Sequence, residues 1–137
     1  MLLAIDAGNT HIVLGCFEGD SLRFTARLCT DRAKTRDEYA LLFRSLFDLH
    51  HVDPGSAEGA ILSCVVSELT DILCQAAAAV TGKNVLVVGA GIKTGLNIKI
   101  DDPGQLGADL VVDAVAATEK YPKPMIIFDM GTANTMS

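Results

Sequence analysis

The chain has 137 residues, of which 50% are hydrophobic and 5% aromatic, so it can bury an aliphatic core in one domain and begin a second. Its formal charge of -6 excludes a sequence-independent grip on nucleic acid, which needs a basic surface. Aspartates interrupt the longest apolar runs, so no membrane helix is expected. The cysteines form no C-x-x-C pair and no signal peptide is recognisable, which predicts reduced, mostly buried thiols in a cytoplasmic protein.

The first part of the chain predicts a meander of three short strands, at residues 2–6, 11–17 and 21–28. The sequences AGNT and EGD between them are typical of turns. From Arg36 the apolar residues recur with helical spacing until a Pro54-Gly55 stop, which predicts an amphipathic helix. Its inward face would consist of Tyr39, Leu42, Phe43, Leu46 and Phe47.

Strands and helices alternate in the rest of the chain. Residues 59–66 predict a buried strand, Ser67 is the expected cap of the next helix, and residues 84–88 predict another buried strand. The glycine-rich segment 89–107 predicts a shaped loop with one short strand around 96–100. A helix over 106–121 should end at Pro122 and Pro124, before a last strand at 125–129. A meander followed by alternating helices and strands predicts an α/β domain with a mixed sheet.

One sequence device occurs twice. The segments LLAIDAGNTHIVL and MIIFDMGTANTMS both consist of an apolar strand, an aspartate, one residue, a glycine and then Asn or Thr. A carboxylate at a strand end can hold a divalent ion through water, and the glycine turn can present backbone N–H groups to a phosphate. Thr10, and Thr132 or Thr135, could add hydroxyl donors. One copy is often only a hairpin, but two copies so far apart predict a phosphate site.

The two copies resemble the paired phosphate motifs of the superfamily that contains acetate kinase, sugar kinases, Hsp70 and actin. The segments MLLAIDAGNTHIVLG, ILSCVVSEL, GIKTGLNIKIDDPGQLGADLVVDAVAA and FDMGTANT are together similar to the type III pantothenate kinases, over the whole chain. This resemblance implies an actin-like (ribonuclease H-like) fold. It also implies ATP-dependent phosphorylation of pantothenate to 4'-phosphopantothenate, the first step of coenzyme A biosynthesis. The expected cofactors are ATP, Mg²⁺ or another divalent cation, and K⁺ or NH₄⁺, in a homodimer that binds neither nucleic acid nor membrane.

The resemblance also assigns roles to residues. Asp109 falls on the catalytic aspartate, which would accept the proton of the attacking hydroxyl. Asp129 resembles the ligand of the monovalent cation, and Asp6 would order Mg²⁺ through water. The pantothenate-contacting tetrad corresponds to Gly107, Ala108, Asp109 and Leu110. The ATP and phosphate contacts correspond to Asp6, Ala7, Gly8, Asn9, Thr10, His11, Ile12, Val13 and Thr132.

The resemblance places residues 1–122 in a first actin-like domain and residues 123–137 at the start of a second, which the chain would not complete. We therefore expect a fragment with little or no kinase activity alone. Its last strand should be disordered or should pair with another molecule, because it lacks sheet partners.

Two residues depart from the family pattern. Leu110 replaces an arginine that could pair with a substrate carboxylate, and Ile100 replaces a common tyrosine. Asp109 alone could equally be a helix cap, and a solvent-facing strand position explains His11 equally well. Two other functions stay open: a non-catalytic actin-like binding protein, which Leu110 favours, and a sugar kinase, whose usual substrate signatures are missing.

Overall fold

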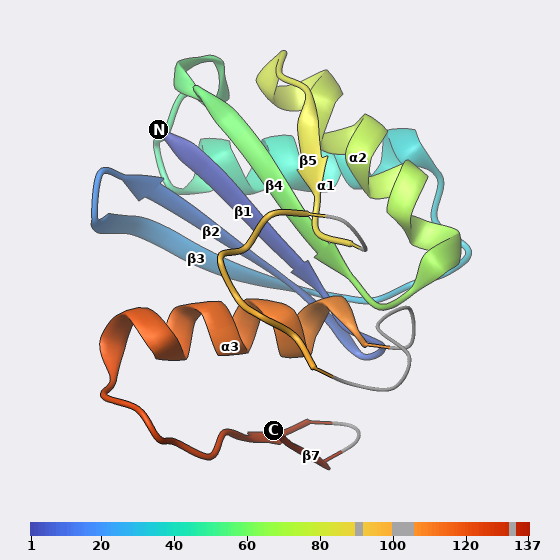
Figure 1. Ribbon diagram of the computed structural model, residues 1–137. Coiled ribbons are helices and arrows are strands. Elements are labelled where there is room, and N and C mark those ends of the chain that lie inside the picture. Colours follow the sequence, from blue (N-terminus) through green and yellow to red (C-terminus); the bar gives the residue numbers. More distant parts are fainter. Residues whose placement is uncertain (90–91, 100–105, 132–133) are drawn as a thin grey trace. The chain divides into compact units, whose positions relative to one another are not determined.

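The computed structural model describes residues 1–89, 92–99, 106–131 and 134–137 (Figure 1). These residues form two compact units, Met1–Val87 and Val88–Ser137. The boundary expected at residue 122 concerns the arrangement of actin-like domains and stays a prediction.

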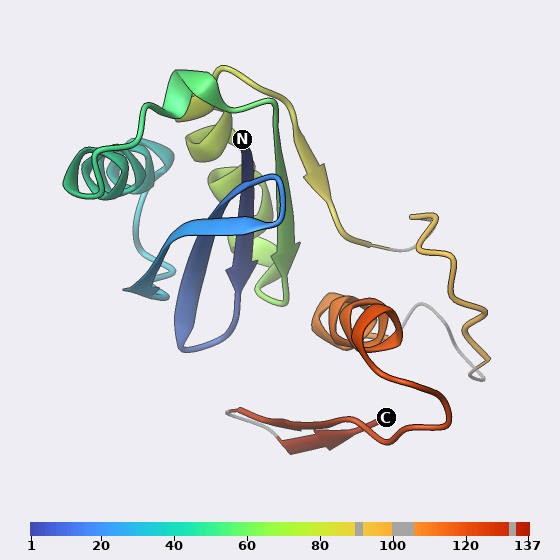
Figure 2. The same ribbon diagram turned by 90° about the vertical axis from the view of Figure 1, so that its left-hand side faces the viewer.

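The first unit contains a five-stranded mixed sheet in the order β3-β2-β1-β4-β5. The central strand β1 is antiparallel to β2 and parallel to β4, and β4 is parallel to β5. Figures 1 and 2 show the arrowheads of β1 and β4 pointing the same way. The predicted α/β class with a mixed sheet is thus confirmed. The strands are β1 (Leu2–Ala7), β2 (His11–Glu18), β3 (Ser21–Cys29), β4 (Gly59–Cys64) and β5 (Val85–Val87).

The core lies on one face of this sheet. Alternate residues of β1, namely Leu3, Ile5 and Ala7, are buried, as the two-residue period of a strand requires. Two helices cover this face, α1 (Arg36–Leu49), which runs behind the sheet in Figure 1, and α2 (Ser67–Thr81). The helix α1 contributes three fully buried aromatic rings, each worth about 1.5–3 kcal/mol of burial. These rings belong to Tyr39, Phe43 and Phe47, all predicted to face inward.

The helix α1 begins with a capping box. The amide of Glu38 donates to Thr35 Oγ1, and the amide of Thr35 donates to the Glu38 carboxylate at 2.8 Å. The hydroxyl of Thr35 also donates to Glu38 Oε2 at 2.9 Å. These bonds from the Thr35 backbone and side chain lower the pKa of Glu38 below its ordinary value.

The helix α2 begins differently from the sequence expectation. Its N-cap is Val66, which makes no side-chain capping bond, so the prediction that Ser67 caps the helix is wrong. The strand is followed by a tight first turn of the helix, in which the amide of Leu69 donates to the Val66 carbonyl at 2.9 Å. The helix ends at Gly82, whose φ of 69° suits a residue without a Cβ.

The last strand of the sheet and the cysteines are less buried than expected. Strand β5 lies at the sheet edge, and Leu86 and Val87 are exposed, so the prediction of a buried strand is wrong there. Among the cysteines, all free, only Cys16 is buried, and burial raises the pKa of its thiol. Cys29, at the end of the other edge strand, is exposed.

The second unit consists of one helix and one hairpin in its described part. Residues 96–99 form no strand, contrary to the prediction for 96–100, and residue 100 lies outside the described residues. The helix α3 (Ala108–Lys120) follows, with no fully buried side chain. Among the described residues, no helix is long and apolar enough to cross a bilayer.

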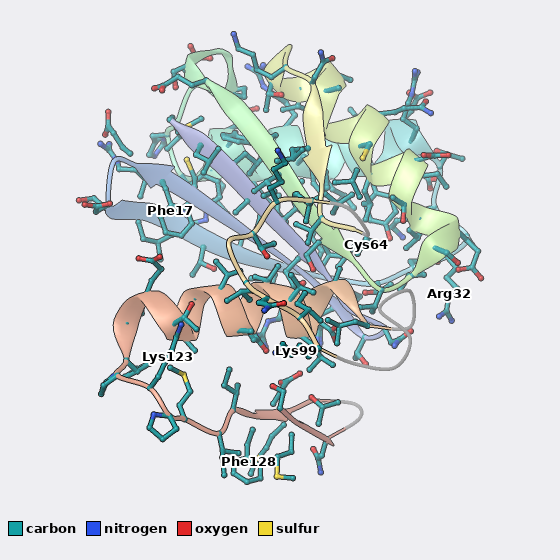
Figure 3. All side chains as sticks on the ribbon, in the orientation of Figure 1. Phe17, Arg32, Cys64, Lys99, Lys123 and Phe128 are labelled. Carbon is teal, nitrogen blue, oxygen red and sulfur yellow. The ribbon has the colours of Figure 1, made fainter. Side chains whose placement is uncertain are left out.

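The predicted last strand has a partner in its own chain. Strand β6 (Phe128–Met130) pairs antiparallel with β7 (Asn134–Met136), and Ile127 and Ser137 exchange backbone hydrogen bonds of 2.8 and 2.9 Å. The expectation of a lone strand that is disordered or paired with another molecule is therefore wrong for the described residues. The strand is still apolar and exposed: Phe128 points outward from the hairpin (Figure 3).

The capping box predicts a stability effect. Replacing Thr35 by Ala should lower the free energy of unfolding by about 1 kcal/mol at neutral pH, measured by urea denaturation. Because the pKa of Glu38 is depressed in the fold, its contribution is present above its unfolded pKa and is lost as the pH falls through its folded pKa. The deficit of Thr35→Ala should therefore shrink in acid. Thr35→Ser, which keeps the cap, should match the wild type, and an equal loss in both variants would contradict the capping role.

Candidate functional site

The first copy of the repeated device forms the tight turn between β1 and β2. Asp6 is the next-to-last residue of β1 and pairs with Val13. The chain reverses through Asn9 and Thr10, and the amide of Gly8 donates to the His11 carbonyl at 2.9 Å. We call residues 8–11 the β1–β2 turn. The predicted turn at AGNT is confirmed.

The residues predicted to contact ATP divide by exposure. The side chains of Ala7 and Ile12 are fully buried in the core, so these two residues can offer a ligand only their backbone. Asp6, with Asn9 and Thr10 of the turn, is exposed. The amide of Gly8 already serves the turn and is not available to a phosphate. The potential ligand-binding side chains are thus those of Asp6, Asn9, Thr10 and His11, with Val13 half-buried on the following strand.

The segment after β3 braces this turn. Thr30 Oγ1 donates to the Gly8 carbonyl at 2.7 Å, and the Thr30 amide donates to the Thr10 carbonyl at 2.9 Å. Arg32, labelled in Figure 3, donates from Nη2 to Asn9 Oδ1 at 3.1 Å. Both ends of the turn are therefore tied to one neighbouring segment.

The brace is itself anchored in the core. The hydroxyl of buried Tyr39 donates to the Asp31 carbonyl at 2.9 Å and accepts from the Asp31 amide at 3.0 Å. The Asp31 carboxylate in turn accepts from Lys34 Nζ at 2.8 Å and from the Ala33 amide at 3.0 Å. These bonds, with Lys34 first, lower the pKa of Asp31, while Asp31 raises the pKa of Lys34. The hydrogen bonds therefore connect helix α1 to the β1–β2 turn.

A serine lies beside Asp6 on the parallel strand. Asp6 pairs with Ser63 of β4 in the register of the sheet. Together with Thr10, these residues offer carboxylate and hydroxyl oxygens, the donor type that Mg²⁺ prefers. Ser63 Oγ is buried and has no hydrogen-bond partner, so the residues here fit a hydrated magnesium and phosphate group. No group of three or more His, Cys, Asp or Glu side chains in the described ranges could hold a metal by itself.

The second copy of the device has a different register. Asp129 pairs with Thr135, six residues later, whereas Asp6 pairs with Val13, seven residues later. The second hairpin is therefore one residue shorter, and it places a threonine where the first has a valine. The predicted ATP contact at position 132 lies outside the described residues.

Asp109 lies in the first turn of α3. The N-cap of this helix is Gly107, without a side-chain capping bond, so Asp109 is not the N-cap residue. Its carboxylate accepts from the amide of Leu110 at 2.9 Å and so still satisfies one first-turn N–H group. A Cβ on Gly107 would lie 2.3 Å from Asp109 Oδ1, so the glycine leaves the room that this carboxylate occupies.

Asp129 lines a shallow hollow within the second unit. The other lining residues include Asp113, Ala117 and Lys120 of α3, of which Asp113 lies one helical turn after Asp109 (i, i+4). A separate polar hollow lies in the first unit, at the start of β1, and it holds no predicted site residue. Its lining comprises Met1, Glu18, Arg23, His51, Val52, Asp53 and Ser56.

Sequence comparison identifies relatives over almost the whole chain. The profile of the family "Type III pantothenate kinase" matches residues 2–137. Proteins with the same name from Exiguobacterium sp. (strain ATCC BAA-1283 / AT1b), Geobacter sulfurreducens and Moorella thermoacetica are 48%, 47% and 44% identical to the chain over 135 residues. Each alignment covers 98% of this chain and 53% of the relative, so the chain spans about half the length of these relatives. The chain belongs to the type III pantothenate kinase family.

Proposed function

We propose that the chain carries the first phosphate site and the catalytic aspartate of an ATP-dependent pantothenate kinase. The observation that carries this proposal is the turn beside Asp6, which Thr30 holds in place through hydrogen bonds to the Gly8 and Thr10 carbonyls. Its sequence, an aspartate at a strand end followed by a glycine turn, is the one expected for a phosphate loop. Phosphoryl transfer depends mainly on positioning and on charge neutralisation. A turn fixed at Gly8 and Thr10 meets the first requirement, and oxygen ligands that suit magnesium meet the second.

The chemistry assigned to this chain is acceptance of a proton. ATP, when bound, supplies the phosphoryl group. Asp109 accepts the proton of the pantothenate primary hydroxyl as that oxygen forms its bond to the γ-phosphorus, while the bond from this phosphorus to the bridging oxygen breaks and ADP leaves. The glycine at position 107 keeps the space around this carboxylate open, and the α3 N-terminus favours negative charge nearby. Asp6 would hold the magnesium ion through water, and the ion would neutralise phosphate charge.

The resemblance extends the proposal to conditions and assembly. We assign Asp129 to the monovalent cation, K⁺ or NH₄⁺, and place the reaction in a cytoplasmic homodimer. Support for the cation comes from Thr135, which lies across the hairpin from Asp129 and whose Oγ1 is buried without a hydrogen-bond partner. Coordination to the cation would satisfy that hydroxyl oxygen.

A non-catalytic binding protein is the second candidate function. The observation in its favour is Leu110, which follows Asp109 where an arginine would pair with the substrate carboxylate. Such a protein would keep phosphate binding at the β1–β2 turn without transferring a phosphoryl group.

The proposed activity is tested by product formation. The chain, and the chain joined to the C-terminal half of the Exiguobacterium relative, are incubated with ATP, Mg²⁺, K⁺ and pantothenate. Mass spectrometry should detect phosphopantothenate with the extended protein and little or none with the 137-residue chain. Mg·ATP binding without product in the folded extended protein would contradict the kinase and favour the binding protein.

Asp109 should be needed for turnover and not for nucleotide binding. In the extended protein, Asp109→Asn should lower kcat by about 100-fold or more, because a positioned proton acceptor contributes that much. The dissociation constant for Mg·ATP, measured by calorimetry, should not change. The matched control is Asp37→Asn, a first-turn aspartate of α1, which should keep full activity. Equal rates for both variants would remove Asp109 from catalysis.

The brace should influence nucleotide affinity. Thr30→Val keeps the shape of the side chain but removes the hydrogen bond to the Gly8 carbonyl. A net loss of about 1 kcal/mol corresponds to roughly fivefold weaker Mg·ATP binding by calorimetry. Thr30→Ser keeps the hydroxyl and should bind as the wild type does. Unchanged affinity in Thr30→Val would show that the brace does not serve the ligand.

A further inference from the structure

Ser63 is a buried polar side chain without a partner. It lies on β4 with 5% of its surface exposed, and its Oγ makes no hydrogen bond. Another buried polar side chain, that of Thr81, donates from Oγ1 to the Ala77 carbonyl at 2.8 Å. An unpaired buried hydroxyl costs stability, because it gives up its hydrogen bonds to water. Ser63 therefore differs from Thr81, whose hydroxyl is satisfied by a carbonyl of its own helix.

The register of the sheet places Ser63 beside Asp6. Because Leu3, Ile5 and Ala7 face the core, Asp6 belongs to the opposite face of β1. Ser63 is its partner in the parallel pairing with β4 and shares that face, one strand spacing of about 4.8 Å away. Both residues lie near the carboxyl ends of their strands, which point the same way in Figure 2. In open α/β sheets, ligands bind outside the carboxyl ends of the strands.

We propose that the Ser63 hydroxyl is a further contact for the magnesium-bound phosphate group of ATP, beside Asp6 and the β1–β2 turn. This inference rests on the proposed function. A hydroxyl donates one hydrogen bond and accepts two, so Ser63 Oγ donates to a phosphate oxygen and accepts from a water of the magnesium ion. Its buried position keeps this bond away from competing solvent. The ligand satisfies the hydroxyl that the protein leaves unpaired.

The test measures two properties of Ser63→Ala: its thermal midpoint without ligand and its affinity for Mg·ATP. A structural role of the hydroxyl predicts a lower midpoint in this variant, whereas a ligand contact predicts a lower affinity. Without ligand, the thermal midpoint of Ser63→Ala should equal or exceed that of the wild type, because an unpaired hydroxyl is removed. Mg·ATP binding, measured by calorimetry on the extended protein, should weaken about tenfold or more, as expected for a hydrogen bond to a charged group.

Two controls accompany this variant. Ser63→Thr keeps a hydroxyl and should restore most of the affinity. Ser45→Ala removes an exposed hydroxyl that bonds the Leu41 carbonyl within α1 and should leave binding unchanged.

The outcomes separate this inference from the proposed function. Wild-type affinity in Ser63→Ala overturns the Ser63 contact alone, as does a variant that is less stable or fails to fold, since the hydroxyl would then serve the structure. An extended wild-type protein without measurable affinity for Mg·ATP overturns both proposals.

Discussion

The position of the β1–β2 turn depends on Thr30. Its two hydrogen bonds hold the carbonyls of Gly8 and Thr10, at the two ends of the reversal. Thr30 is held in place by its neighbour Asp31, whose backbone is bonded to the buried hydroxyl of Tyr39. The hydrophobic core that buries Tyr39 therefore also determines where the turn lies. The packing of the core thereby fixes the position of the exposed turn that we propose as a phosphate site.

The two faces of the sheet then have different tasks. One face of β1 packs Leu3, Ile5 and Ala7 against helices, while the other presents Asp6 beside Ser63. The antiparallel neighbour β2 supplies the tight turn, and the parallel neighbour β4 brings a second strand end to the same edge. A mixed sheet thus brings a tight turn and the carboxyl end of a parallel strand together at one place. The second unit repeats the hairpin with a shorter register and adds Asp109 at a helix start.

Much of this could be predicted from the sequence because the signals are local. The two-residue and helical periods located the five strands of the first unit and α1 to within two residues, and the first aspartate-glycine device located the β1–β2 turn. The last strand begins three residues later than predicted, at Phe128, and its pairing with β7 was not predicted. The brace by Thr30 could not be predicted, because it depends on how the end of β3 lies beside the start of β2. Ser63 was missed for the same reason, since only the parallel register places it beside Asp6. The Ser67 cap was wrong because Ser67 is already the first residue of the helix, and Val66, at the end of the tight entry from β4, takes the N-cap position.

The central claim is that the Asp6 turn binds the magnesium-bound phosphates of ATP. It is tested most directly by titrating Mg·ATP into the isotopically labelled extended protein and following backbone amide resonances by NMR. The account predicts that the largest shifts fall on Gly8 to Thr10, Thr30 and Ser63, and that they vanish when magnesium is removed. Shifts confined to the polar hollow around Met1 and His51, or no shifts at all, would contradict it.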